Sequence, residues 1–296
     1  MAVKPPTPLI RYLRVQEHFE RSLLIELTRS QSNIDAVLRT MVKDDRIGAT
    51  IRRAQLREVQ REIKKEMARL WRLVGSQVMA DRALASAAAV ESLAATYVPM
   101  LTAAGMSASA IDVLIRSQKA TAARGIANVA TRMNLSKIPL SERVYKSGAL
   151  VSGRIDRLVN DHIARGSSAR DIAKDVRQFI DPHVKGGVRY AAQRLGRTEL
   201  NNAFHGTQVQ EGIKNPMITV MRWNLSGSHP RPDECNDYET GGDLEDGLWS
   251  PGAVPGKPHP QCLCFMTAET PSRAEFIRNF RSGEYDSYLD KVIAGG

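Results

Sequence analysis

Hydrophobic side chains recur at helical spacing over most of the first 130 residues of the chain. In residues 23–41 and again in residues 56–74 they return every three or four positions, the repeat that lines one face of an α-helix. These segments are therefore predicted to be long helices whose apolar seams pack against other helices. A further helix is predicted for residues 107–130. The sequence DDRIG at 44–48 is predicted to separate the first two helices, and Pro99 to end or kink the second.

The pattern changes in the second half of the chain. A capping-box spacing predicts a short helix over residues 168–180, and a longer helix is predicted over residues 188–212. Residues 217–223 (MITVMRW) are rich in strand-forming types, whereas glycine, proline and aspartate dominate residues 225–260. A last helix is predicted near residues 272–280. The fold class expected is mainly α: long N-terminal helices followed by an α+β domain with a loop-rich segment that contains cysteine and histidine.

The composition is that of a folded protein without a membrane span. Of the 296 residues, 42% are hydrophobic, which is enough for a sizeable core. We find no run of eighteen apolar residues and no signal-peptide pattern, so we expect the chain to be made and to fold in a cytosol. With only three cysteines in that compartment, a disulfide framework is not expected, and a metal site or a free thiol stays open.

The formal charge of +10 indicates a surface that tolerates or attracts polyanions. Basic residues are densest along the second predicted helix, outside its apolar seam. Two interpretations stay open for this run. It is either a solvated face whose charges pair with Glu58 and Glu62, or a contact surface for an acidic partner or for the phosphates of double-stranded DNA, without sequence readout. The residues assigned to this contact are Arg52, Arg53, Arg57, Arg61, Lys64 and Lys65.

All three cysteines lie between residues 229 and 264, together with two histidines. In an extended strand, residues two apart project to the same side, so Cys262 and Cys264 can offer two thiolates to one ion. Cys235 and His259 would complete a tetrahedral, structural zinc site, with His229 as a reserve ligand. A disulfide from Cys235 to Cys262 or Cys264 and inert buried thiols are the alternatives.

A polar stripe follows the helix predicted over residues 188–212. Arg197, Asn201 and His205 fall four residues apart, and Glu199 and Asn202 lie alongside them. The stripe is either an internal hydrogen-bond scaffold for the loop-rich segment or an acid/base cluster of a metal-dependent nuclease or transferase that also uses the Cys/His cluster. Cys235 with a histidine could form a nucleophile and base, but no third group that would orient the base is evident. Because glycine-rich phosphate loops, HExxH and GxSxG are absent, no catalytic residue is assigned.

Five sequence elements occur in an order known from one protein family. They are LSERVY, ARGSSARDIAKDV, RTELNNAFHGTQVQEG, MRWNLSGSHPRPDECNDYETGG and PGKPHPQCLCFM. In these elements the chain resembles the Mu F-like head morphogenesis family of tailed bacteriophages. The resemblance covers residues 140–268, and the helical part before them matches no motif of the family.

The resemblance implies a minor capsid protein that acts in head morphogenesis at or near the portal, inside the head, and that contacts packaged DNA or is ejected with it. Its implied partners are the portal protein and the major capsid or scaffold protein, with several copies around the portal. The implied locations are the host cytoplasm during assembly and then the virion. The domains expected are a long-helix domain at 1–138 that docks on the portal or on neighbouring copies, a Mu F-like domain at 139–268 and a tail at 269–296. The 32 residues after Cys264 are expected to be too few for a toxin domain.

Overall fold

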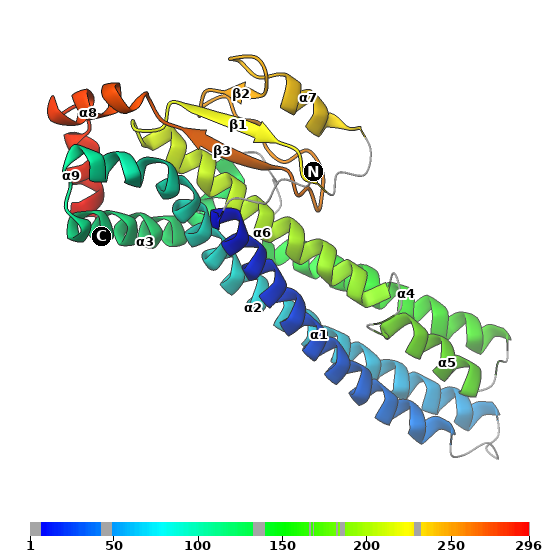
Figure 1. Cartoon of the computed structure of the whole chain (residues 1–296). Coiled ribbons are helices and arrows are strands. Elements are labelled where there is room, and N and C mark those ends of the chain that lie inside the picture. The colour runs from blue at the N-terminus through cyan, green and yellow to red at the C-terminus, as the bar shows by residue number, and fades with distance from the viewer. Residues whose placement is uncertain are drawn as a thin grey trace. The chain divides into compact units, whose positions relative to one another are not determined.

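The structure is a computed structural model that describes residues 7–42, 49–132, 140–165, 167, 169–181, 183, 187–227 and 232–295. These residues are mainly helical with one small sheet, which confirms the predicted fold class (Figure 1). The helices are α1 (Thr7–Val42), α2 (Ala49–Ala104), α3 (Ala108–Arg132), α4 (Leu140–Arg165), α5 (Ala169–Ile180), α6 (Gly187–Lys214), α7 (Glu234–Thr240), α8 (Arg273–Arg281) and α9 (Asp286–Ala294). The strands are β1 (Val220–Asn224), β2 (Leu248–Trp249) and β3 (Phe265–Glu269).

The chain divides into two compact units. Unit 1 consists of Met1–Gln16, Ala80–Lys137 and Arg197–Gly296, and unit 2 consists of Glu17–Met79 and Ile138–Gly196. The helices α1, α2 and α6 each continue from one unit into the other. Because these long helices supply residues to both, the units do not coincide with the consecutive segments 1–138, 139–268 and 269–296 expected from the sequence.

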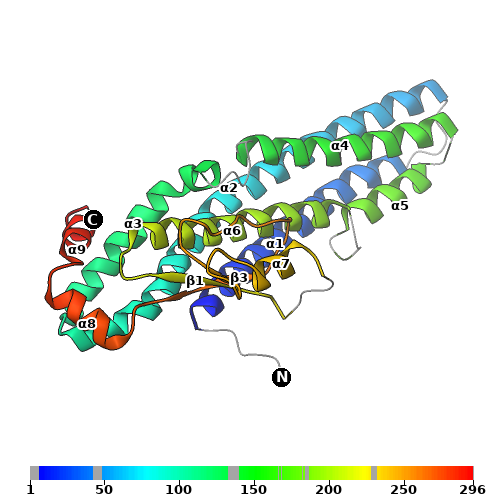
Figure 2. The ribbon, with the colours of Figure 1, turned by 90° about the horizontal axis from the view of Figure 1, so that it is seen from above.

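Unit 2 is built on the predicted apolar seams. Within it α1 and α2 lie side by side, as the view from above makes clear (Figure 2). The two helices are also linked by Ser30 Oγ, which donates to Glu66 Oε1 at 2.7 Å. The seam residues of these helices are at most 7% exposed: Leu23, Leu27, Ile34, Leu38, Leu56, Val59, Ile63, Met67, Leu70 and Val74. The periodicity alone therefore identified this core, except at Met41, whose side chain lies outside the described residues.

Two glycines set the close packing of the other helices in unit 2. A Cβ at Gly148 of α4 would lie 2.9 Å from Trp71 Cγ, and a Cβ at Gly196 of α6 would lie 2.1 Å from the Phe19 ring. Both rings are buried. A side chain at either position would therefore have to displace a buried ring.

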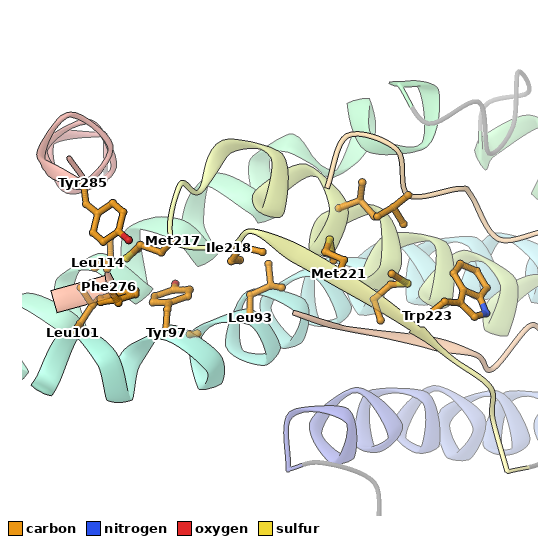
Figure 3. Close-up of a cluster of buried hydrophobic side chains, with 14 of the residues drawn as sticks. Leu93, Tyr97, Leu101, Leu114, Met217, Ile218, Met221, Trp223, Phe276 and Tyr285 are labelled. Carbon is orange, nitrogen blue, oxygen red and sulfur yellow. The ribbon is translucent and has the colours of Figure 1, made fainter. Parts of the chain in front are cut away.

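The core of unit 1 joins the C-terminal half of α2 to α3, the sheet, α8 and α9. Figure 3 shows Tyr97 from α2, Met221 and Trp223 from β1, and Phe276 and Tyr285 from the C-terminal region in one buried cluster. Polar bonds link the same helices. Tyr97 Oη donates to Gln118 Oε1, and Gln118 Nε2 donates to Tyr288 Oη, both at 2.7 Å. The expected tail at 269–296 is thus part of this core.

The sheet is antiparallel, with β1 between β2 and β3. Met221 and Trp223 point to the buried face of β1, and Trp223 pairs with Met266 of β3. The chain between α7 and β2 turns sharply, because Gly242 and Gly247 have φ values of 112° and 72°. These are values that glycine adopts without strain.

Three local features differ from the sequence-based expectations. Pro99 does not end α2, which continues to Ala104. The buried residues Tyr97 and Leu101 anchor the helix on both sides of this proline, and such packing outweighs local propensity. The two neighbouring cysteines precede β3, which starts at Phe265, rather than lying in a strand. Helix α7 forms within the segment that was expected to be loop-rich.

One window of α2 is long and apolar enough, by composition, to cross a membrane. Half of that window is buried inside the protein, as is usual for a core helix.

Candidate metal centre

Three of the predicted ligands come together in unit 1. The ligand atoms of Cys235, His259 and Cys262 all lie within 4.8 Å of one another. Cys235 Sγ is 3.5 Å from Cys262 Sγ and 3.5 Å from His259 Nε2. All three cysteines are buried, free thiols. Cys235 and Cys262 are therefore not joined by a disulfide, whose S–S bond is about 2.05 Å.

The spacing of these atoms fits a tetrahedral metal ion. With Zn–S bonds of about 2.3 Å and a Zn–N bond of about 2.0 Å, tetrahedral angles separate two sulfurs by about 3.8 Å and a sulfur from a nitrogen by about 3.5 Å. The two separations from Cys235 Sγ, both 3.5 Å, agree with these edges to within about 0.3 Å, and Cys262 Sγ and His259 Nε2 lie within 4.8 Å of each other. The cluster can therefore accept such an ion with small side-chain adjustments.

Cys264 lies next to this group without belonging to it. Its thiol interacts with the thiols of Cys262 and Cys235, and it is 2% exposed. It is thus the nearest further soft ligand. His229 lies outside the described residues.

His259 presents one ring nitrogen to the cluster. Its Nδ1 lies 3.1 Å from the carbonyl oxygen of Pro260, a position from which it can donate, and this leaves Nε2 for a metal ion. Asp233 places Oδ2 3.1 Å from the same Nε2. The side chain of His259 is 38% exposed, whereas the thiols are buried. An ion would therefore reach the thiols past His259, where the carboxylate of Asp233 attracts cations.

Local backbone features aim two of the thiols. Asp233 caps α7: its Oδ1 accepts from the backbone N–H of Cys235 at 2.8 Å, and its own N–H donates to Asn236 Oδ1 at 3.0 Å. This capping box fixes Cys235 in the first turn of the helix. On the other side, Gln261 adopts a left-handed backbone with φ of 60° and turns the chain directly before Cys262. For a residue other than glycine this costs about 1 kcal/mol.

One face of α6 holds the segment that carries the cysteines. Thr198, Asn201, His205 and Gln208, spaced by three, four and three residues, form what we call the polar ladder. Thr198 Oγ1 accepts from Gln261 N–H at 3.2 Å, and Asn201 Nδ2 donates to the carbonyl oxygen of Cys262.

The other two members of the polar ladder also bind backbone. His205 Nε2 lies 2.8 Å from the carbonyl oxygen of Pro255, and Gln208 Nε2 donates to that of Met266 at 3.3 Å. The polar ladder thus satisfies four backbone groups between residues 255 and 266, most of which is irregular and has few backbone partners of its own.

Lys257 points into the same region. Its Nζ donates to the carbonyl oxygen of Cys264 and lies 4.9 Å from the centroid of the Trp223 ring. Trp223 in turn makes edge contacts with His205 and Tyr238, with centroids 5.6 Å and 5.0 Å apart. A cation is thereby held against an aromatic face beside the three thiols.

The charges of the cluster act on one another. The hydrogen bond from Cys264 and then the positive charge of Lys257 lower the pKa of the Cys262 thiol. The pKa of Cys235 is raised, first by burial and then by the negative charge on Cys262, and the pKa of Cys264 is raised by its hydrogen bond to Cys262. Without a metal ion, the cluster therefore favours one thiolate, at Cys262.

His205 is a neutral hydrogen-bonding group. Burial and then the charge of Lys257 lower its pKa to about 3. At neutral pH its imidazole thus has a single proton, and the 2.8 Å contact of Nε2 with the Pro255 carbonyl places this proton on Nε2.

Of the other members of the predicted polar stripe, Glu199 is buried, and Arg197 and Asn202 are half-buried. Among the described residues, Glu199 does not belong to the group whose ligand atoms meet at the cluster. The contact with Pro255 joins His205 to the backbone scaffold, and the acid/base interpretation of Glu199 stays a prediction.

The predicted basic contact run is partly occupied by ion pairs within unit 2. Arg61 pairs with Glu58, Lys65 with Glu62, and Lys64 with Asp156 of α4 at 2.8 Å. Such exposed pairs contribute little to stability, because water and salt screen them. Arg57 is exposed, and the side chains of Arg52 and Arg53 lie outside the described residues.

Sequence reasoning missed three residues of the site: Thr198, Gln208 and Lys257. The first two share one helical face with Asn201 and His205, which the predicted stripe contained, so their spacing was a readable signal. No sequence signal marked Lys257, because a lysine in a proline-rich loop normally points to solvent.

Comparison with known proteins gives no relative for this chain: no family model, no curated protein and no solved structure matches it.

Proposed function

We propose that this chain is a minor head protein of a tailed bacteriophage, which acts in head morphogenesis at or near the portal. We further propose that Cys264 completes the cluster of Cys235, His259 and Cys262 into a structural zinc site. Zinc takes four ligands in such sites, and three thiolates with one imidazole are a usual set. The ion would supply folding energy to the segment that bears the ligands.

The observation that supports this proposal is the convergence of the family-like motifs. The motif RTELNNAFHGTQVQEG forms most of the second half of α6, the motif beginning MRW starts in β1, and PGKPHPQCLCFM is the segment bound by the polar ladder. Segments that are distant in the sequence thus build one site. Motifs that occur in the same order as in a family support a relation to it when, as here, they fold together into one domain.

The assembly role is tested on particles. Mass spectrometry of purified virions should detect the chain in a small number of copies per head, and pull-down of the tagged chain from infected cells should recover the portal protein. Absence of the chain from both the virions and their assembly intermediates would reject this role, whatever the metal content.

The zinc site is tested on the purified protein. Elemental analysis should give about one zinc per chain, and Cys264→Ser should weaken zinc binding without abolishing the fold, because three ligands remain. An unchanged zinc affinity in Cys264→Ser would remove Cys264 from the ligand set.

Contact with packaged DNA is part of the proposal because the charge is unevenly distributed. Unit 2 has 24 Lys and Arg against 15 Asp and Glu, a net charge of +9, whereas unit 1 has 18 against 17, a net charge of +1. A basic surface binds DNA through phosphates and releases counterions.

Binding to double-stranded DNA should therefore fall steeply between 50 and 300 mM salt, with the log–log slope giving about 0.9 per phosphate contact. Arg57→Glu should weaken it, and Arg61→Glu should weaken it less, because Arg61 already pairs with Glu58. Binding that does not depend on salt would contradict phosphate contact, and DNA cleavage with zinc present would favour the nuclease interpretation instead.

A further inference from the structure

We propose that Lys257 is the counter-charge of the metal centre, the group that makes the loaded site electrically neutral. This inference rests on the zinc site proposed above and extends it from the ligands to the residue that balances their charge.

The position of the Lys257 ammonium is fixed by two contacts. Its Nζ donates to the carbonyl oxygen of Cys264, which belongs to the proposed fourth ligand, and lies 4.9 Å from the centroid of Trp223. A lysine on a loop ordinarily extends its amine into water. Here the amine is directed inward, where one neighbour is part of the ligand segment and the other is a fully buried ring.

Among the described residues, Lys257 is the cation whose charge acts on the thiol of Cys262. A divalent ion with three thiolates and one neutral imidazole has a net charge of −1. The ligand sulfurs are at most 2% exposed, and a buried, unbalanced charge is costly. His205 is neutral, and Asp233 contributes a further negative charge at the solvent-facing edge. Lys257 is thus the cation that brings the buried part of the site to zero.

Loss of the charge should consequently affect the loaded site more than the metal-free one. In the metal-free Lys257→Met protein the Cys262 thiol can take up a proton, which leaves the empty site neutral. Zinc binding would then create an unbalanced negative charge. If Lys257 only supported the fold, its replacement would instead destabilise the protein equally with and without zinc.

The experiment compares zinc affinity by competition with a chromophoric chelator in the full chain and in four variants. Lys257→Met removes the charge, Lys257→Gln removes it but keeps a donor for the Cys264 carbonyl, and Lys257→Arg keeps it. Lys291→Met, an exposed lysine of α9 in the same unit, is the matched control.

We expect both neutral variants at position 257 to bind zinc about 10- to 100-fold more weakly, the range for groups that support metal ligands. Lys257→Arg and Lys291→Met should remain within about threefold of the parent. The thermal midpoint of the Met variant should lie further below that of the parent with zinc bound than without zinc.

Three results would overturn the proposal. Equal affinity of the neutral variants and the parent would exclude a counter-charge while leaving the zinc site intact. Parent-like binding by Lys257→Gln alone would assign Lys257 to hydrogen bonding instead. If the parent itself binds no zinc, the metal site fails and this inference fails with it.

Discussion

Units 1 and 2 both have apolar cores, but they differ in how the segments outside the core are held. In unit 2, apolar seams such as the one that ends at Val74 pack helix against helix, and the surplus of positive charge lies on the surface. In unit 1, a comparable apolar core exists around Tyr97 and Trp223, but the segment beside it is attached by hydrogen bonds and thiols. The difference is that a seam can lose one contact and keep the rest, whereas the attached segment depends on a few specific groups.

Removal of the thiol cluster should produce the largest difference in stability between unit 1 and unit 2. The double variant Cys235→Ser/Cys262→Ser should lose cooperative melting of the sheet region, because zinc sites contribute about 10 kcal/mol and a domain has only about 5–15 kcal/mol in total. Limited proteolysis should show new cleavage from about Leu225 onward. A Trp71→Phe background leaves Trp223 and Trp249, both in unit 1, as fluorescence reporters.

Chelation of the parent should reproduce the digestion pattern of the double variant, and a chelator added to the variant should change nothing. If the double variant digests and melts like the parent, the cluster does not hold the segment and unit 1 resembles unit 2 after all.

The corresponding test in unit 2 adds a side chain where two helices pack closely. Gly196→Ala places a Cβ against the buried Phe19 ring and should destabilise unit 2 by about 3 kcal/mol. Gly153→Ala, in α4 with open space around it, should stabilise by about 0.5–1 kcal/mol. Segment-resolved hydrogen exchange would locate both effects. Equal effects of the two substitutions would show that this helix packing is not tight.

The polar ladder should respond to a single hydrogen bond. Asn201→Ala leaves the Cys262 carbonyl without its donor and should cost about 1–3 kcal/mol in chemical denaturation of unit 1. Asn202→Ala, its half-buried neighbour, should cost less than about 0.5 kcal/mol. If the control loses as much as Asn201→Ala, the effect comes from α6 itself rather than from the ladder.

A further effect concerns pH. His205 has a folded-state pKa of about 3 against 6.5 as its ordinary value. The unfolded chain therefore gains a proton first as pH falls. The stability that the neutral imidazole provides is complete above about pH 6.5 and declines below it, by up to about 1.4 kcal/mol per pH unit.

The measurement is the stability difference between the parent and His205→Gln at matched zinc, from pH 7 to pH 4.5, because contributions common to both proteins cancel. The advantage of the parent should shrink as pH falls. A difference that is constant with pH would mean that the imidazole is not held neutral.

The predictability of the two units differs for the same physical reason. The seam of α2 from Leu56 to Val74 was readable because helical periodicity is a local property of the sequence. The approach of Cys235 to Cys262 was expected only as one possibility, since it depends on the capping of α7 by Asp233 and on the turn at Gln261.

The contacts of the polar ladder were beyond prediction for another reason. The expected stripe included His205, but which backbone atom each side chain meets depends on the path of residues 255–266 across α6. The inward direction of Lys257 follows from the positions of Trp223 and the Cys264 carbonyl, both of which are tertiary facts. The zinc ligands could be predicted from the residue types alone, whereas the proposed counter-charge at Lys257 could be inferred only from the fold.

The discontinuous make-up of the units has a consequence for biosynthesis. All of unit 2 has been translated once Gly196 leaves the ribosome, so its helices can assemble while the rest of the chain is still being made. The core of unit 1 includes Leu289, so its earlier segments, such as the one ending at Lys137, must wait with apolar faces exposed. Apolar surface that is exposed during this interval favours aggregation of the nascent chain.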